Sequence, residues 1–130
     1  MTESRLLGTD VPLREAFDAA LVDLDGVAYK GRNAIPTAPP ALEAARAAGM
    51  HVVFVTNNAS REPETVADHL SELGIPCAPG EVMTAAQAGA ELLAEHVPAG
   101  EKVLVIGGAG LSGIQSAGEV AEFRDRHHAP

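Results

Sequence analysis

The sequence has little cysteine and few aromatic residues. Its 130 residues include one cysteine, Cys77, and no tryptophan, and aromatic residues together account for 3%. With a single cysteine, an intrachain disulfide is excluded. Cys77 stands in the segment Pro76-Cys77-Ala78-Pro79, and prolines at this spacing favour a loop. We therefore interpret Cys77 as an unreactive loop thiol rather than a catalytic nucleophile.

The chain also lacks an excess of positive charge and any long apolar run. Nine basic residues stand against 18 acidic ones, for a formal charge of −9, which excludes the basic surface of a nucleic-acid-binding protein. An acidic protein can still bind phosphate where backbone N–H groups or a metal ion offset the charge. No apolar run approaches the roughly 20 residues of a membrane span, and the first ten residues contain no signal-peptide core. We expect a cytoplasmic protein without a membrane or nucleic-acid partner.

Apolar runs that stop abruptly at polar residues are present twice. Ala19–Val22 runs into Asp-Leu-Asp-Gly, and Val52–Val55 runs into Thr-Asn-Asn. Short apolar runs rich in β-branched residues are typical of parallel strands that are buried on both faces. Both runs are therefore predicted to be central strands.

Helical patterns alternate with these strands. A helix is predicted between Thr37 and Ala48, closed by Gly49, and another from Pro63 to Gly74. A third strand at Val82–Thr84 is followed by an alanine-rich helix over Ala85–His96, and Lys102–Gly107 is a fourth strand candidate. This alternation predicts an α/β protein with a parallel, Rossmann-like sheet.

Polar side chains follow the first two predicted strands. The carboxyl ends of parallel strands meet at one edge of the sheet, where ligands bind. Two carboxylates two residues apart can share a magnesium ion with phosphate oxygens. One carboxylate can then attack a phosphorus atom while the other transfers protons, and a threonine hydroxyl can donate to the phosphoryl oxygens. A solvated polar turn is the alternative for either strand end alone, but the two ends converge. The candidate residues are Asp23, Asp25 and Gly26 after the first strand, and Thr56, Asn57 and Asn58 after the second.

These motifs resemble the haloacid dehalogenase superfamily of phosphatases. The resemblance rests on Asp23–Val27 (DLDGV), on Tyr29–Gly31, and on Val55–Arg61 (VTNNASR) about 30 residues later. Within the superfamily, the motifs are most similar to subfamily IIA. That subfamily contains nagD-type sugar phosphatases, p-nitrophenyl phosphatases, phosphoglycolate phosphatases and glycerol-3-phosphate phosphatases.

The resemblance implies a role for each candidate residue. Asp23 would be the nucleophile that forms an aspartyl-phosphate, and Asp25 the general acid and base. The Asp23 carboxylate and the Asp25 main-chain carbonyl would hold Mg²⁺. Thr56, with Asn57 and Asn58 beside it and with Gly26, would bind the phosphoryl group of a small phosphorylated substrate. The segment Tyr29–Asn33 would form a flap next to the site.

The resemblance also implies a second domain that this chain does not complete. Residues 1–88 would be the N-terminal part of the hydrolase core, and residues 89–130 the start of an α/β cap, truncated or divergent after about residue 110. A lysine after the cap and a late acidic pair normally complete the site. Lys30 and Lys102 are the chain's only lysines, and neither has the expected context. We expect the chain alone to turn over substrate weakly or not at all.

Two other functions are compatible with parts of the sequence. Gly108, Gly110 and Gly113 form a GxGxxG pattern after an apolar run, as in dinucleotide-binding modules. That interpretation also requires an acidic residue about 20 positions later, and the sequence stops first. Alternatively, the chain is a non-catalytic fragment or assembly module whose exposed strand edges and apolar faces favour homo-oligomers.

Overall fold

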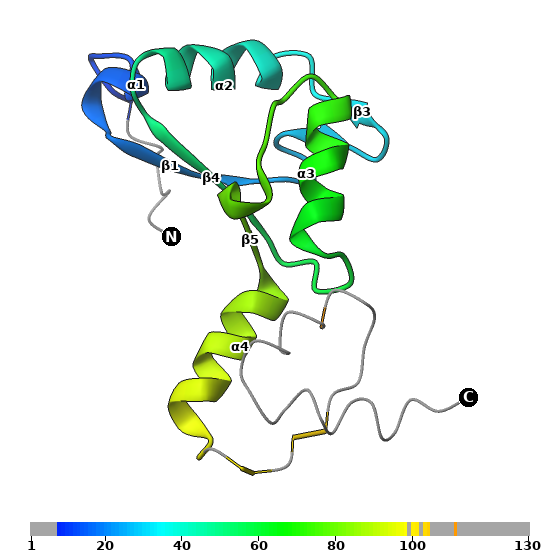
Figure 1. Cartoon of the computed structure of the whole chain (residues 1–130). Helices are drawn as coiled ribbons and strands as arrows, with labels where there is room; N and C mark the ends of the chain where they lie inside the picture. Colours follow the sequence, from blue (N-terminus) through cyan, green and yellow to red (C-terminus); the bar gives the residue numbers. More distant parts are fainter. Residues whose placement is uncertain (1–7, 99, 102, 105–110, 112–130) are drawn as a thin grey trace, which may run out of the picture.

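The fold follows from a computed structural model that describes residues 8–98, 100, 101, 103, 104 and 111. Up to residue 96 the structure contains the strands and helices that the sequence predicts, together with a short N-terminal helix, a two-stranded hairpin and a 3₁₀ turn that were not predicted (Figure 1). In chain order the elements are α1 (Leu13–Ala16), β1 (Ala19–Asp23), β2 (Tyr29–Lys30), β3 (Asn33–Ala34), α2 (Ala38–Ala47), β4 (His51–Thr56), α3 (Pro63–Glu72), the 3₁₀ turn η1 (Pro79–Glu81), β5 (Val82–Thr84) and α4 (Ala85–His96).

Three of the strands form one parallel sheet in the order β1-β4-β5. The register pairs Asp23 with Val55 and Thr56 with Thr84. Consequently, β1, β4 and β5 all end at the same edge of the sheet. The parallel α/β architecture is confirmed, and with it the convergence of the first two strand ends. The short strands β2 and β3 form a separate antiparallel hairpin.

The core lies on one face of this sheet. Val52 and Phe54 of β4 point to that face and are 4% and 0% exposed. Val66 and Leu70 of α3 pack in the same cluster, and Leu42 of α2 packs against it. The predicted helices α2 and α3 therefore each turn an apolar face to the sheet.

The ends of the helices also match the sequence pattern. α2 and α3 stop just before Gly49 and Gly74, which have φ angles of 88° and 83°. Glycine adopts this left-handed conformation without a steric penalty. At the start of α4, Thr84 and Gln87 form a capping box. The Thr84 N–H donates to Gln87 Oε1 at 2.9 Å, and the Gln87 N–H donates to Thr84 Oγ1 at 3.2 Å.

The prediction that both apolar runs are central strands is wrong for β1. Within the described residues, β4 is the central strand and β1 is an edge strand. Leu21 is 75% exposed, because it lies on the face opposite to the one that α2 and α3 cover. Figure 1 shows α4 extending away from the sheet, so it does not cover β1. An apolar run indicates that a strand favours burial, but it does not specify which elements cover the strand.

Several expectations concern the C-terminal region. Val103 and Leu104, from the fourth strand candidate, have no assigned strand, and Lys102 and residues 105–107 lie outside the described residues. The GxGxxG glycines Gly108, Gly110 and Gly113 also lie outside them. In the described part of the chain, no helix has the length and apolar character that a membrane crossing requires.

The one-sided core predicts different responses to two apolar truncations in the 130-residue chain. Phe54→Ala removes a fully buried ring and should lower the free energy of unfolding by about 3–5 kcal/mol. Leu21→Ala removes an exposed side chain and should change it by less than about 0.5 kcal/mol. Urea unfolding followed by circular dichroism measures both. Equal losses in the two variants would contradict this description of the core.

Candidate active site

The turn after β1 is organised around Leu24. The Leu24 side chain is 1% exposed and belongs to the core. Its carbonyl oxygen accepts hydrogen bonds from the N–H groups of Val27, Ala28 and Tyr29, at 3.2, 2.9 and 3.2 Å. Side chains alternate in direction along extended backbone. With Leu24 fixed in the core, its neighbours Asp23 and Asp25 are exposed to solvent.

The two aspartates are not equivalent. Asp23 is the last residue of β1, and its Oδ1 accepts a hydrogen bond from the Leu24 N–H at 2.8 Å. Asp25 pairs with Tyr29 in an isolated β-bridge, and the Gly26 N–H donates to the Tyr29 carbonyl oxygen at 2.7 Å. Gly26 has a φ of 83°, a conformation that closes this tight turn and that other residues rarely adopt. Asp23 is therefore held by its side chain, and Asp25 by its backbone.

The segment after β4 forms a second structured polar turn. The Asn58 N–H donates to Thr56 Oγ1 at 3.1 Å, and the Ser60 N–H donates to Asn58 Oδ1 at 2.8 Å. The Thr56 hydroxyl therefore accepts one bond, and no described residue accepts its hydrogen. A hydroxyl in this state can donate to a ligand oxygen.

The two turns line one open pocket of about 400 Å³. Five of the six predicted site residues are brought together in it. Gly26 is not in the lining, and its N–H is bonded to Tyr29. The lining residues are Asp23, Asp25, Tyr29, Gly31, Thr56, Asn57, Asn58 and Arg61.

Three lining residues were not among the predicted site residues. Tyr29 and Gly31 belong to the segment expected as a flap, and the β2–β3 hairpin places them at the pocket. Arg61 was quoted as part of the VTNNASR motif and given no role. The sequence feature that could have pointed to Arg61 is the presence of a single basic residue five positions after the end of an apolar strand.

The charges of the pocket act on Tyr29. Its ring is partly buried and packs edge-on against His69 of α3, with ring centroids 5.0 Å apart. Burial raises the pKa of Tyr29, the positive charge of Arg61 lowers it, and the carboxylates of Asp25 and Asp23 raise it. The tyrosine hydroxyl therefore stays protonated at neutral pH, where it can donate a hydrogen bond.

The pocket has the donor chemistry for a hard divalent cation. Asp23 and Asp25 supply carboxylate oxygens, and Mg²⁺ typically takes one or two carboxylates together with water and phosphate oxygens. Over the described ranges, no group of three or more His, Cys, Asp or Glu side chains is arranged as a complete metal site. The residues present thus fit a magnesium ion whose ligands come partly from the protein and partly from the substrate, rather than from the protein alone.

Cys77 and Lys30 lie outside this pocket. Burial and the negative charge of Glu81 raise the pKa of the Cys77 thiol to about 11, although Arg46 acts in the opposite direction. The thiolate is the reactive form, so the raised pKa lowers the reactivity of Cys77 at neutral pH. Lys30 is exposed on β2.

Together, the fold and the pocket define a class of protein. It is an α/β protein with a Rossmann-like parallel sheet, and it carries a carboxylate pair and a hydroxyl-amide turn at the carboxyl edge of that sheet. In such folds this edge is where ligands bind.

Comparisons with known proteins identify the family. The family model of haloacid dehalogenase-like hydrolases matches residues 20–118. The chain therefore belongs to the haloacid dehalogenase-like hydrolases, as the sequence motifs predict.

Named relatives in this family are phosphatases. The chain is 41% identical over 101 residues to an acid sugar phosphatase of Staphylococcus saprophyticus, covering 78% of this chain and 39% of the relative. It is 38% identical over 120 residues to a D-glycerol 3-phosphate phosphatase of Mycobacterium tuberculosis, covering 90% and 33%. A crystal structure of the M. tuberculosis glycerol phosphate phosphatase in complex with magnesium superposes with a TM-score of 0.75 at 38% identity, covering 81% and 32%. The chain thus spans about a third to two fifths of the length of these relatives.

The raised pKa of Cys77 predicts slow alkylation. At pH 8 the folded chain should react with iodoacetamide at least about tenfold more slowly than free cysteine, since far less thiolate is present. The rate should rise with pH up to about 11, and mass spectrometry of quenched samples measures it. The urea-unfolded chain is the control and should react like a free thiol. Equal alkylation rates for the folded and unfolded chains would contradict a raised pKa for Cys77 in the folded chain.

Proposed function

We propose that this protein is a magnesium-dependent phosphomonoester hydrolase that acts through an aspartyl-phosphate on a small phosphorylated metabolite. The main support is the pocket that Asp23 and Asp25 line together with the Thr56–Asn58 turn. Family membership and the named phosphatases among the relatives give independent support. Sugar phosphates, glycerol phosphate, phosphoglycolate and p-nitrophenyl phosphate form the substrate class.

Asp23 is the nucleophile in this proposal. Its Oδ1 is engaged by the Leu24 N–H, so Oδ2 is the oxygen that attacks phosphorus. The new bond joins Asp23 Oδ2 to phosphorus as the bond from phosphorus to the substrate oxygen breaks. The hydrogen bond to Oδ1 restricts rotation of the carboxylate and favours this orientation.

Asp25 transfers the protons. It donates one to the substrate oxygen as the alcohol leaves, and afterwards takes one from the water that attacks the phosphorus of the aspartyl-phosphate. The bond from phosphorus to Asp23 breaks as the water oxygen bonds to phosphorus, which releases inorganic phosphate, restores the Asp23 carboxylate and leaves Asp25 protonated for the next cycle. The backbone bridge between Asp25 and Tyr29 keeps the carboxyl at the pocket through both steps.

The remaining phosphoryl oxygens need hydrogen-bond donors. The Thr56 hydroxyl and the side-chain amides of Asn57 and Asn58 line the pocket and supply them. Magnesium, held by the Asp23 carboxylate and the Asp25 main-chain carbonyl, would offset negative charge on the phosphoryl group and the carboxylates when bound.

We further propose that these 130 residues alone turn over substrate slowly. In the family pattern a later lysine and a late acidic pair complete the site, and the sequence has no counterpart in the expected context. Each missing electrostatic contact typically costs about 10²-fold in rate.

The direct test uses p-nitrophenyl phosphate and Mg²⁺ with the protein expressed from its complete coding sequence. Asp23→Asn should lower kcat by about 10³-fold or more, because the amide cannot form the intermediate. Asp68→Asn is the matched control, since Asp68 is exposed on α3 and outside the pocket. It should stay within twofold of the unmodified protein.

Two outcomes would contradict the proposal. Equal turnover by the Asp23→Asn protein and the unmodified protein would exclude Asp23 as the nucleophile. Turnover by the 130-residue chain at the rate of the complete protein would contradict the expectation that later residues are required.

A further inference from the structure

We propose that Arg61 binds the phosphoryl group of the substrate and supplies the positive charge that this part of the site requires. The inference rests on the proposed phosphatase function, and it assigns a substrate-binding role to a residue that neither the motif analysis nor the comparisons assign.

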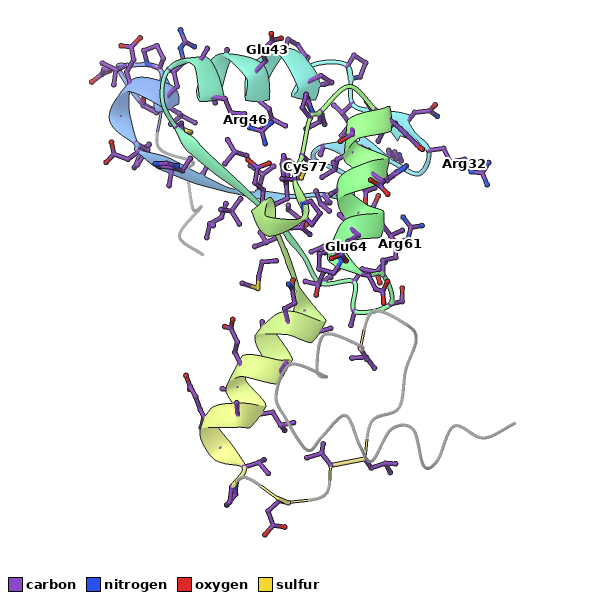
Figure 2. All side chains as sticks on the ribbon, in the orientation of Figure 1. Arg32, Glu43, Arg46, Arg61, Glu64 and Cys77 are labelled. Atoms are coloured by element: carbon purple, nitrogen blue, oxygen red, sulfur yellow. The ribbon has the colours of Figure 1, made fainter. Side chains whose placement is uncertain are left out.

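The position of Arg61 follows from the turn after β4. Asn58 closes this turn by accepting the Ser60 N–H, and Arg61 comes next, two residues before α3 begins at Pro63. Figure 2 shows Arg61 beside the first turn of α3. Arg61 lines the same pocket as Asp23 and Thr56, so the turn that presents the hydroxyl also presents the guanidinium group.

The charge balance of the pocket explains why a cation is needed there. Two carboxylates line it, and a phosphomonoester brings up to two more negative charges. Like charges this close together repel one another, and the repulsion is stronger near a protein surface than in bulk water. Among the described residues that line the pocket, Arg61 is the one basic residue. Its charge acts on Tyr29, another lining residue: burial raises the pKa of Tyr29, Arg61 lowers it, and the two aspartates raise it.

Arg61 is also available for a ligand. No described carboxylate lies within ion-pair distance of it. By contrast, Arg46 pairs with Glu81 at 3.1 Å and lies 5.8 Å from the centre of the Phe54 ring. An unpaired guanidinium group can bind two phosphoryl oxygens at once, which lysine cannot do.

Other described cations do not compete for this role. Lys30 and Arg32 belong to the β2–β3 hairpin and are absent from the pocket lining. In Figure 2, Arg32 projects away from the body of the molecule. Arg32 therefore provides a control in which the same charge is removed from a nearby surface position.

The test measures binding of inorganic phosphate by calorimetry in the presence of Mg²⁺, using the protein from its complete coding sequence. Arg61→Gln should weaken phosphate binding about tenfold and raise the KM for p-nitrophenyl phosphate to a similar extent, because a charged hydrogen bond is lost. Arg61→Lys should give an intermediate affinity, because it keeps the charge without the paired donors. Arg32→Gln should bind phosphate within twofold of the unmodified protein.

Two results would overturn the assignment. One is Arg61→Gln protein that binds phosphate as tightly as the unmodified protein. The other is a defect confined to substrates with a second anionic group, such as phosphoglycolate, which would place Arg61 against that group instead. Phosphate affinity does not require turnover. If phosphate affinity depends on Arg61 but turnover does not depend on Asp23, this inference is supported and the proposed function is contradicted. If turnover depends on Asp23 but phosphate affinity does not depend on Arg61, this inference is overturned and the proposed function stands.

Discussion

The burial of Leu24 is the constraint on which the candidate site depends. Its side chain is fixed in the core, and its carbonyl oxygen accepts three N–H groups from the turn that follows. Since neighbouring side chains in extended backbone point to opposite sides, this anchor directs both flanking aspartates to solvent. The apolar residue at the centre of the DxD motif thus acts as a positioning element. Its own N–H also holds Asp23 Oδ1, which links the core directly to the carboxylate.

The parallel register supplies the second half of the site. Because Asp23 is paired with Val55, the polar turn that begins at Thr56 lies beside the aspartate turn. This arrangement concentrates negative charge in a protein that is already acidic, with a formal charge of −9. Hydrogen-bond donors and Arg61 line the same pocket as the two carboxylates. A phosphate-binding site in this chain therefore depends on local charge and on donors rather than on net charge.

The sequence was sufficient to predict the order of the sheet strands β1, β4 and β5 and of the helices α2, α3 and α4, the parallel sheet, and the convergence of the two strand ends. Those features follow from local periodicity and from glycines at helix ends. The edge position of β1 could not be predicted, because the coverage of Leu21 depends on elements far away in the sequence. The short helix α1 (Leu13–Ala16) has no buried residue and left no apolar pattern to detect. Arg61 was missed because a basic residue in a loop is usually solvated, and its proposed role rests on its place in the pocket lining.

The central claim is that Asp23 becomes phosphorylated during turnover, and chemical trapping tests it most directly. The protein from the complete coding sequence, carrying Asp25→Asn to slow hydrolysis of the intermediate, is incubated with p-nitrophenyl phosphate and Mg²⁺, then quenched in acid and reduced with borohydride. Borohydride converts an aspartyl-phosphate to homoserine, which peptide mass spectrometry locates. The account predicts homoserine at position 23 and none in the matched Asp23→Asn protein. Release of phosphate by the unmodified protein, with the modification at another residue or at none, would contradict it.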